Sequence, residues 1–314
     1  MPGEVSGVAG APAARFLFYM HALLADTLLV FVAASLTKPI QPVFEAYAAR
    51  TGTVILRESG ASLEHVRKIT ELGRIPDLIL LADDEVFGQM LVPTYTTWHA
   101  QFARNRLVVA YTDRSKRANE INASNWTRIV RGKDVEIGRT DPNLAPVGYR
   151  TLLMFQLAER FYKEKGLAAS LLKASPERNL RPNAAELAAL LAAGELDYIY
   201  DYQSVAESNG FRFIALPDAI NLGDTKRAAE YGAVSTTVRG ASPGSRATFK
   251  GQPILYGLSI PKRAPHEAAA KRFLTYLTSA PVQKQLRDAH VDMLEQPIVV
   301  GAGAPAELRG ASRN

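Results

Sequence analysis

The chain has 314 residues, 47% hydrophobic and 22% charged, which predicts about two globular domains and excludes a disordered, collagenous or coiled-coil protein. Its 37 basic and 31 acidic residues give a net charge of +6 and a pI near 9.4. This charge is spread along the chain, so we expect no nucleic-acid partner. Cysteine is absent, which excludes disulfides, thiolate metal sites and iron–sulfur clusters.

Residues 1–25 have the pattern of an export signal. Arg15 precedes an apolar run, FLFYMHALLA, over residues 16–25. The run is shorter than the roughly 20 apolar residues that span a bilayer, but it suits the hydrophobic region of a signal peptide, with Ala25 as a small residue for cleavage. We therefore predict that residues 1–25 are a signal peptide and that the protein is periplasmic; the alternative is a buried N-terminal helix.

The next part of the chain alternates between strands and helices. Continuous apolar runs rich in β-branched residues are typical of strands buried on both faces of a sheet, and segments with helix signals separate them. The expected strands lie over 27–33, 54–58 and 77–82, and the expected helices over 36–50 and 63–72. This β-α-β-α-β order predicts a parallel sheet with helices on both faces.

A second α/β unit follows the first. We expect its strands and helices, and those that end the chain, over 106–112, 135–138, 197–202, 211–216 and 254–260 (strands) and 148–166, 184–193, 265–279 and 281–289 (helices). Residues 218–250 are rich in Gly, Ser and charge and are predicted to be mostly loop. The final strand and helices are expected to return to the first unit, and residues 301–314 to form a disordered tail.

Sequence signatures of catalysis and metal binding are weak. The chain has no P-loop, G-x-G-x-x-G or H-E-x-x-H motif. His290 and Asp292 form a lone H-x-D pair, which we expect at the surface or in a cap. Asp83, Asp84 and Glu85 follow an expected strand end. We interpret them as a solvated first helical turn, where the helix dipole favours negative charge, with a divalent-cation cluster as the alternative.

Small or hydroxyl residues recur where an expected strand is followed by a helix. Four such junctions lie at 33–36, 59–62, 145–148 and 182–186, two in each α/β unit. Helix N-termini present free backbone N–H groups that bind anions, and ligands of such sheets bind at the carboxyl ends of strands. The sequence therefore predicts an anion-binding cleft between the two units. Asn183 and Glu186 also have the spacing of a helix cap.

Six segments, in this order, resemble the molybdate/tungstate-binding proteins of ABC importers, in particular the branch best known from archaea. They are FVAASL (31–36), RESGASLEHVRKITELG (57–73), FARNRLVVAYTDRSKRANEINASNW (102–126), PVGYRTLLMFQLAE (146–159), LRPNAAELAALLAAGELDYIYDYQSVAESNGF (180–211) and PILYGLSIPKRAP (253–265). The resemblance implies the two-lobed, type II periplasmic-binding-protein fold, with a mixed, mostly parallel sheet flanked by helices in each lobe. It also implies a monomer without cofactor or catalysis. Such a protein closes on a tetrahedral oxyanion, molybdate or tungstate, and delivers it to a membrane permease.

The resemblance further implies where the chain passes between the lobes and which residues meet the oxyanion. Lobe 1 would comprise residues 26–110 and 256–300, and lobe 2 residues 111–255. The oxyanion contacts would be Ala34, Ser35, Ala61, Ser62, Pro146, Val147, Ala184 and Tyr202.

Each of these contacts would offer a different group. The two serines would supply hydroxyls and backbone N–H groups, and Val147 and Ala184 would supply backbone N–H groups at helix N-termini. Pro146 has no N–H and lends shape only. On an extended strand the side chain of Asp201 points away from the face that carries Tyr202. This alternation supports Tyr202 as a phenol donor.

The sequence departs from the archaeal pattern at two positions. In archaeal-type members a carboxylate precedes the Pro-x-Gly-Tyr-Arg segment and another follows Arg-Pro-x; here Ala145 and Ala184 stand at these places. Loss of both implies a neutral site of hydrogen-bond donors, a four-coordinate metal and no direct protein ligand to it. Arg150 is expected to form an ion pair and not to touch the ligand, and Arg104 and Asn105 are expected to be structural.

Three other functions stay open at this point. The same donors suit another tetrahedral oxyanion such as sulfate. An enzyme acting on a phosphorylated metabolite in this scaffold needs a general base near the anion, and the four junctions contain none. A ligand-sensing domain of a regulator needs an attached DNA-binding or signalling module, and no helix-turn-helix pattern is apparent.

Overall fold

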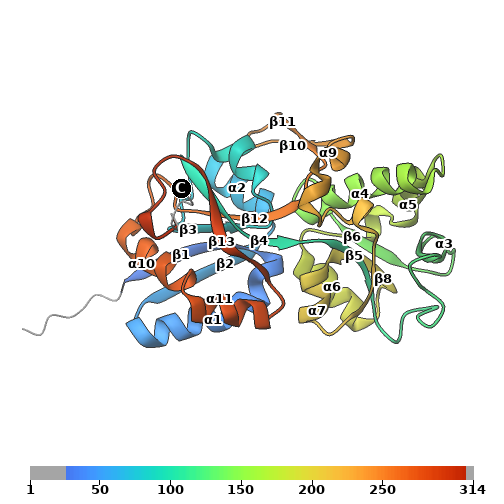
Figure 1. Ribbon diagram of the computed structural model, residues 1–314, viewed down its shortest axis with the longest axis horizontal. Coiled ribbons are helices and arrows are strands. Elements are labelled where there is room, and N and C mark those ends of the chain that lie inside the picture. The colour runs from blue at the N-terminus through green and yellow to red at the C-terminus, as the bar shows by residue number, and fades with distance from the viewer. Residues whose placement is uncertain (1–25, 309–314) are drawn as a thin grey trace, which may run out of the picture.

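The computed structural model describes residues 26–308 as two α/β lobes, each built on its own sheet (Figure 1). The predicted signal peptide over residues 1–25 and the last six residues of the predicted tail lie outside the described part of the chain. None of the helices described is long and apolar enough to span a membrane.

The first lobe is built on a six-stranded sheet with the order β13-β4-β12-β3-β1-β2. Its strands are β1 (Thr27–Ala33), β2 (Val54–Gly60), β3 (Leu78–Leu81), β4 (Trp98–Asn105), β12 (Ile254–Ser259) and β13 (Asp292–Gly301). β2 and β3 both pair in parallel with β1, whereas β12 runs antiparallel to β3 and β4. The helices of this lobe are α1 (Thr37–Thr51), α2 (Ser62–Thr70), α10 (Glu267–Leu277) and α11 (Ala280–Asp288), with a 3-10 turn, η1 (Ala34–Leu36), before α1.

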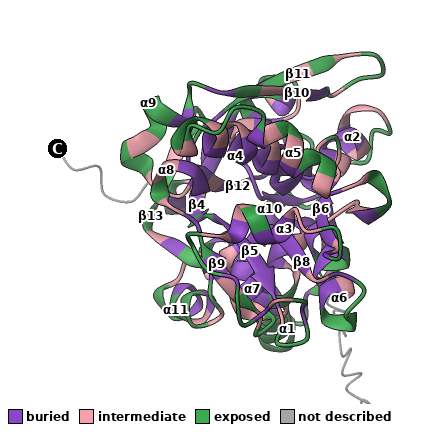
Figure 2. Ribbon diagram, turned by 90° about the vertical axis from the view of Figure 1, so that its right-hand side faces the viewer, coloured by how far each residue is buried: buried purple, intermediate pink, exposed green. Residues whose placement is uncertain are grey.

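The second lobe is built on a five-stranded sheet with the order β7-β6-β8-β5-β9. Its strands are β5 (Leu107–Tyr111), β6 (Ile137–Thr140), β7 (Leu180–Arg181), β8 (Tyr198–Tyr202) and β9 (Arg212–Ala215). Its helices are α3 (Trp126–Val130), α4 (Pro146–Tyr162), α5 (Leu167–Ala174), α6 (Ala184–Ala193) and α7 (Gln203–Ser208). Figure 2, which views the molecule from the side of the second lobe, shows β5 and β8 as buried strands.

The chain passes between the lobes at two points. Arg106 alone separates β4 of the first sheet from β5 of the second. The first crossing therefore lies before residue 107, which corrects the predicted end of lobe 1 at residue 110. The apolar pattern of this strand shows that it is buried but does not indicate which sheet contains it. The chain returns before β12, two residues ahead of the predicted boundary, and β12 joins the first sheet as expected for the final strand.

Several segments differ from the sequence-based expectation. The helix predicted over 148–166 is divided, because Lys163 adopts a left-handed conformation (φ 55°) and α5 begins after Gly166 (φ 84°). Residues 218–250, predicted to be mostly loop, contain α8 (Asp218–Asn221), α9 (Ala228–Tyr231) and a hairpin of β10 (Ser235–Arg239) with β11 (Arg246–Lys250). The predicted disordered tail is ordered at least through residue 308, because Ala304 and Leu308 are buried in the core of the first lobe.

The hairpin turn contains a string that matches a catalytic pattern. Residues 240–244 read GASPG, the G-x-S-x-G spacing of a hydrolase nucleophile elbow. Such an elbow connects a strand to a helix, whereas this segment connects the antiparallel strands β10 and β11. The string is therefore a turn and carries no nucleophile geometry.

Candidate functional site

A small cavity lies between the lobes, where the N-termini of η1, α2, α4 and α6 converge. Its small size suits a ligand of a few atoms. The residues that line it are Ala33, Ala34, Ser35, Gly60, Ala61, Ser62, Ala82, Ala145, Pro146, Val147, Asn183, Ala184 and Tyr202. All of the residues predicted to contact an oxyanion are among them, and none of the lining residues carries a charge.

Three of the four helices that point at the cavity begin with alanine as the N-cap residue. Ala33, Ala61 and Ala145 hold these positions for η1, α2 and α4, and none of them provides a side-chain cap. Alanine is a poor N-cap because it leaves first-turn N–H groups without a hydrogen-bond acceptor. Three N-termini without side-chain caps therefore direct backbone donors at one cavity, where a bound anion would satisfy those that have no other partner. The Leu63 N–H of α2 has one, since it donates to the Leu144 carbonyl at 3.0 Å.

The fourth helix is capped in the ordinary way. The Asn183 side chain accepts a hydrogen bond from the Glu186 N–H at 3.0 Å, which confirms the predicted cap.

On α4, Gly148 permits close packing, since a Cβ at this position would lie 2.6 Å from the Thr140 carbonyl oxygen. This glycine allows the first turn of α4, with Pro146 and Val147, to lie against the end of β6.

The Ser35 hydroxyl receives a directed chain of hydrogen bonds. Asn105 donates through Nδ2 to the Tyr256 hydroxyl at 3.0 Å, and Tyr256 donates to Ser35 Oγ at 2.8 Å. The orientation of the Asn105 amide is set by the Arg106 N–H, which donates to its Oδ1 at 2.9 Å. Because Ser35 already accepts from Tyr256, its own O–H hydrogen remains available to an acceptor in the cavity.

The Ser62 hydroxyl, also in the first lobe, likewise accepts a hydrogen bond from the protein and keeps its own hydrogen free. It is buried, and its Oγ accepts a hydrogen bond from the Ala82 N–H at 3.1 Å. Its hydroxyl hydrogen has no acceptor among residues 26–308, so it is free to donate to a ligand. Ala82 ends the segment after β3 and joins the cavity by the same strand-end geometry as the predicted junctions.

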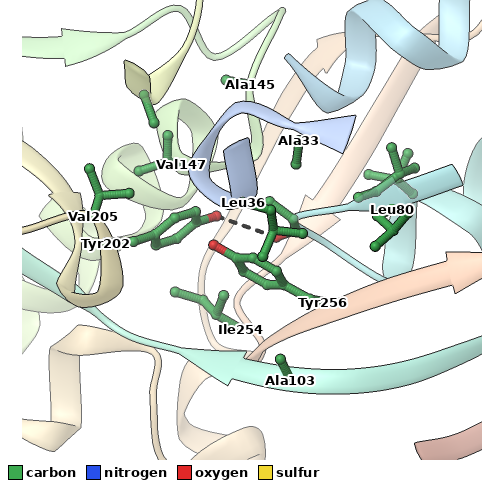
Figure 3. Close-up of a cluster of buried hydrophobic side chains, with 14 of the residues drawn as sticks. Ala33, Leu36, Leu80, Ala103, Ala145, Val147, Tyr202, Val205, Ile254 and Tyr256 are labelled. Carbon is green, nitrogen blue, oxygen red and sulfur yellow. Dashed lines mark hydrogen bonds between the residues drawn. The ribbon is translucent and has the colours of Figure 1, made fainter. Parts of the chain in front are cut away.

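Tyr202 brings a hydroxyl from the second lobe. It lies beside Tyr256, with 5.8 Å between ring centroids (Figure 3), and donates to the Ala82 carbonyl over a long 3.4 Å. Burial raises the pKa of Tyr202 well above its usual value, so the phenol stays protonated and acts as a donor. Asp201 does not line the cavity; its Oδ1 accepts from the Tyr202 N–H, and burial raises its pKa to about 8.

The acidic triplet Asp83, Asp84 and Glu85 does not form the predicted solvated turn. Asp83 is fully buried and accepts hydrogen bonds from Tyr149 and Arg150 of α4. Burial opposes the charge of Arg150, but the neighbouring Asp83 carboxylate raises the pKa of the guanidinium above its usual value. The predicted role of Arg150 as an ion-pair residue is confirmed. The pattern of charges along the chain could not reveal that the opposite lobe covers this turn.

The other polar residues considered from sequence lie away from the cavity. Arg104 pairs with Asp292 at 3.2 Å on the surface, and His290 is half exposed. These positions agree with their expected structural and surface roles. No cluster of His, Asp and Glu within residues 26–308 is arranged to hold a metal ion.

Sequence reasoning missed two kinds of site residue. Ala82 lines the cavity without any side-chain chemistry to mark it, although it follows the end of β3, and a strand end was the signal used for the four junctions. Tyr256 and Asn105 support Ser35 from β12 and β4. No local pattern indicates them, because Tyr256 and Ser35 are 221 positions apart.

Comparison with known proteins gives consistent matches over most of the chain. A family model described as bacterial extracellular solute-binding protein matches residues 28–291. An uncharacterized solute-binding protein from Petrotoga mobilis is 42% identical over 251 residues, covering 80% of this chain and 78% of that protein. The molybdate/tungstate-binding protein WtpA of Thermococcus kodakarensis is 35% identical over 311 residues, covering 90% of this chain and 86% of that one.

The fold also has a counterpart among solved structures. The sulfate-binding protein SubI from Mycobacterium tuberculosis superposes with a TM-score of 0.60 at 13% identity, covering 86% of this chain and 88% of that one. At this identity the likeness concerns the fold alone. It confirms the predicted two-lobed α/β architecture of periplasmic binding proteins.

Proposed function

The chain belongs to the bacterial extracellular solute-binding protein family, whose members are not enzymes, and from this premise we propose that it captures molybdate or tungstate for an ABC importer. The oxyanion binds in the cavity between the lobes and is handed to a membrane permease. The similarity to a relative named as a molybdate/tungstate-binding protein supports this ligand class.

The observation that carries the proposal is that the cavity is uncharged and rich in hydrogen-bond donors. Its lining combines helix N-termini that have no side-chain cap with the hydroxyls of Ser35, Ser62 and Tyr202, and it contains no Asp, Glu, His, Lys or Arg side chain. Such a set of donors suits a small, fully deprotonated anion. Molybdate and tungstate are such dianions at neutral pH.

The same lining supports a four-coordinate metal centre. Ala145 and Ala184 lie at the cavity, and neither has an oxygen that could ligate a metal. The protein would then bind the outer oxygens of an intact tetrahedral ion by hydrogen bonds. A phosphate-ester enzyme is not supported, because the lining offers no general base.

The decisive experiment is calorimetric titration of the purified protein with molybdate, tungstate, sulfate and phosphate. We expect tight binding of the first two and binding of sulfate weaker by about tenfold or more, a difference of about 1.4 kcal/mol. Phosphate should bind worst, because at neutral pH it carries a proton that needs an acceptor. Phosphate binding as tight as molybdate, or sulfate binding tighter than both metal oxyanions, would contradict the proposed ligand.

Export is the second part of the proposal. The proposed signal peptide covers residues 1–25, which precede the described residues. N-terminal sequencing of the protein recovered from outside the cytoplasm should show a mature chain that starts near Asp26. Recovery of the full-length chain from the cytoplasm alone would contradict export.

A further inference from the structure

A fully buried ion pair connects the two lobes beside the cavity without lining it. Asp83 follows β3 in the first lobe, and Arg150 lies in α4 of the second lobe. Arg150 contacts Asp83 Oδ2 through Nη2 at 2.6 Å and Nε at 2.9 Å, and both side chains have 0% exposure. Tyr149 donates its hydroxyl to the same carboxylate oxygen.

Each partner of this pair is attached to one half of the proposed binding site. Asp83 is bonded to Ala82, whose N–H donates to Ser62 and whose carbonyl accepts from Tyr202. Arg150 lies one helical turn beyond Val147, whose position at the N-terminus of α4 faces the cavity. The ion pair thus connects the segment that carries the first-lobe donors to the helix that carries the second-lobe donors.

Arg150 also contacts the segment by which the chain returns to the first lobe. Its Nη1 donates to the Gln252 carbonyl at 2.6 Å, two residues before β12. The Arg150 guanidinium therefore contacts both Asp83 in the first lobe and Gln252 in the segment by which the chain returns to that lobe. A hinge motion about the crossings that separates the lobes has to separate Asp83 from Arg150.

Other contacts between the lobes are weaker candidates for this role. Leu63 donates its backbone N–H to the Leu144 carbonyl at 3.0 Å, which is a neutral contact. Lys38 donates to the Ser208 carbonyl at the exposed rim. Removal of one partner of a buried ion pair is far more costly than the loss of either contact, because the remaining buried charge loses its closest counterion; Glu85 Oε2 is farther from Arg150 Nη2, at 3.5 Å.

We propose that Asp83 and Arg150 are positioning residues that determine oxyanion affinity by stabilising the closed arrangement of the two half-sites. This inference rests on the proposed function. The pair touches no ligand. Its charges are compensated when the lobes are closed and exposed to water when they part, so its loss affects the closed form selectively.

The test compares Arg150→Met, Arg150→Lys and Asp83→Asn with the wild-type protein. We expect Arg150→Met to weaken molybdate binding by about a hundredfold or more, since breaking a buried pair costs several kcal/mol. Asp83→Asn, which keeps the shape and one acceptor oxygen, should weaken binding by about tenfold. Arg150→Lys should recover part of the loss, because it keeps the charge but not the two-point contact.

The matched control is Arg212→Met, which removes an exposed ion pair with Asp113 within the second lobe. It should leave the affinity unchanged, because such exposed pairs contribute little. The unfolding temperature of each variant is also measured with and without molybdate. Small-angle scattering, with and without saturating molybdate, measures how far the protein becomes more compact on binding. The Arg150 variants should unfold near the wild-type temperature without ligand yet gain less thermal stability and compaction from molybdate.

The outcomes separate this inference from the proposed function. Failure of the wild-type protein to bind molybdate or tungstate would overturn the proposed function and this inference with it. Wild-type affinity in folded Asp83→Asn and Arg150→Lys, or a loss of ligand-free thermal stability with unchanged affinity, would overturn the positioning role alone. Asp83→Asn keeps the test valid if Arg150→Met does not fold.

Discussion

Replacement of Ser35 by alanine tests the proposed site most directly. Ser35 Oγ accepts from Tyr256 at 2.8 Å, and Tyr256 accepts from Asn105 at 3.0 Å. This chain leaves the Ser35 O–H pointing away from Tyr256 and available to an oxyanion. Ser35→Ala removes that hydroxyl but keeps the backbone N–H at the uncapped turn.

The size of the effect follows from the nature of the lost bond. A hydrogen bond to a charged group contributes roughly 1.5–3 kcal/mol, so Ser35→Ala should weaken molybdate binding by about 10- to 150-fold without abolishing it. The buried Tyr256 hydroxyl also loses its acceptor, which should lower the free energy of unfolding by about 1–3 kcal/mol. Tyr256→Phe retains the Ser35 hydroxyl and should lower affinity less than Ser35→Ala does.

Calorimetric titration with molybdate measures the affinity, and denaturant unfolding measures the stability. Ser259→Ala is the matched control: this serine is buried in the same lobe and donates to the Trp98 carbonyl at 2.6 Å, away from the cavity. It should lose stability but keep wild-type affinity. Wild-type affinity in Ser35→Ala, or an equal loss of affinity in Ser259→Ala, would refute the reasoning.

Three further predictions concern the second lobe and the metal. Tyr202→Phe should weaken molybdate binding about as much as Ser35→Ala, whereas Asp201→Asn should leave it unchanged in the same titration; the reverse pattern would show that the second-lobe half of the site is misassigned. Asp201 has a pKa of about 8 in the folded protein against 3.8 ordinarily, so the folded state binds the proton more tightly. The resulting stability is lost progressively as the pH rises from 3.8 to about 8. Melting temperatures from pH 5 to 9 should therefore fall more steeply for the wild type than for Asp201→Asn, and parallel curves would contradict the buried acid. X-ray absorption on the loaded protein should show a four-coordinate metal, and a six-coordinate spectrum would mean that protein oxygens ligate it.

Local sequence patterns were sufficient for the parts of the site that lie at strand ends. The carboxyl ends of parallel strands meet at one edge of a sheet, so the junctions at 33–36, 59–62, 145–148 and 182–186 could be assigned to one cleft from the pattern. The family resemblance indicated which of their residues contact the ligand. Their spacing to the preceding strand and the following helix is a short-range property. The capping pair of Asn183 and Glu186 is local in the same sense.

The supporting contacts depended on the tertiary structure. β4 and β13 escaped prediction because their sequences lack a clear strand alternation, and Pro297 interrupts β13. Asp83 looks like a solvent-facing acid until Arg150 of the other lobe covers it, and Tyr256 reaches Ser35 only because β12 returns to the first sheet. Local periodicity shows that a residue lies on a buried face. The distant residue that it contacts depends on how strands far apart in the chain pair with one another, because that pairing is the one that buries the most apolar surface.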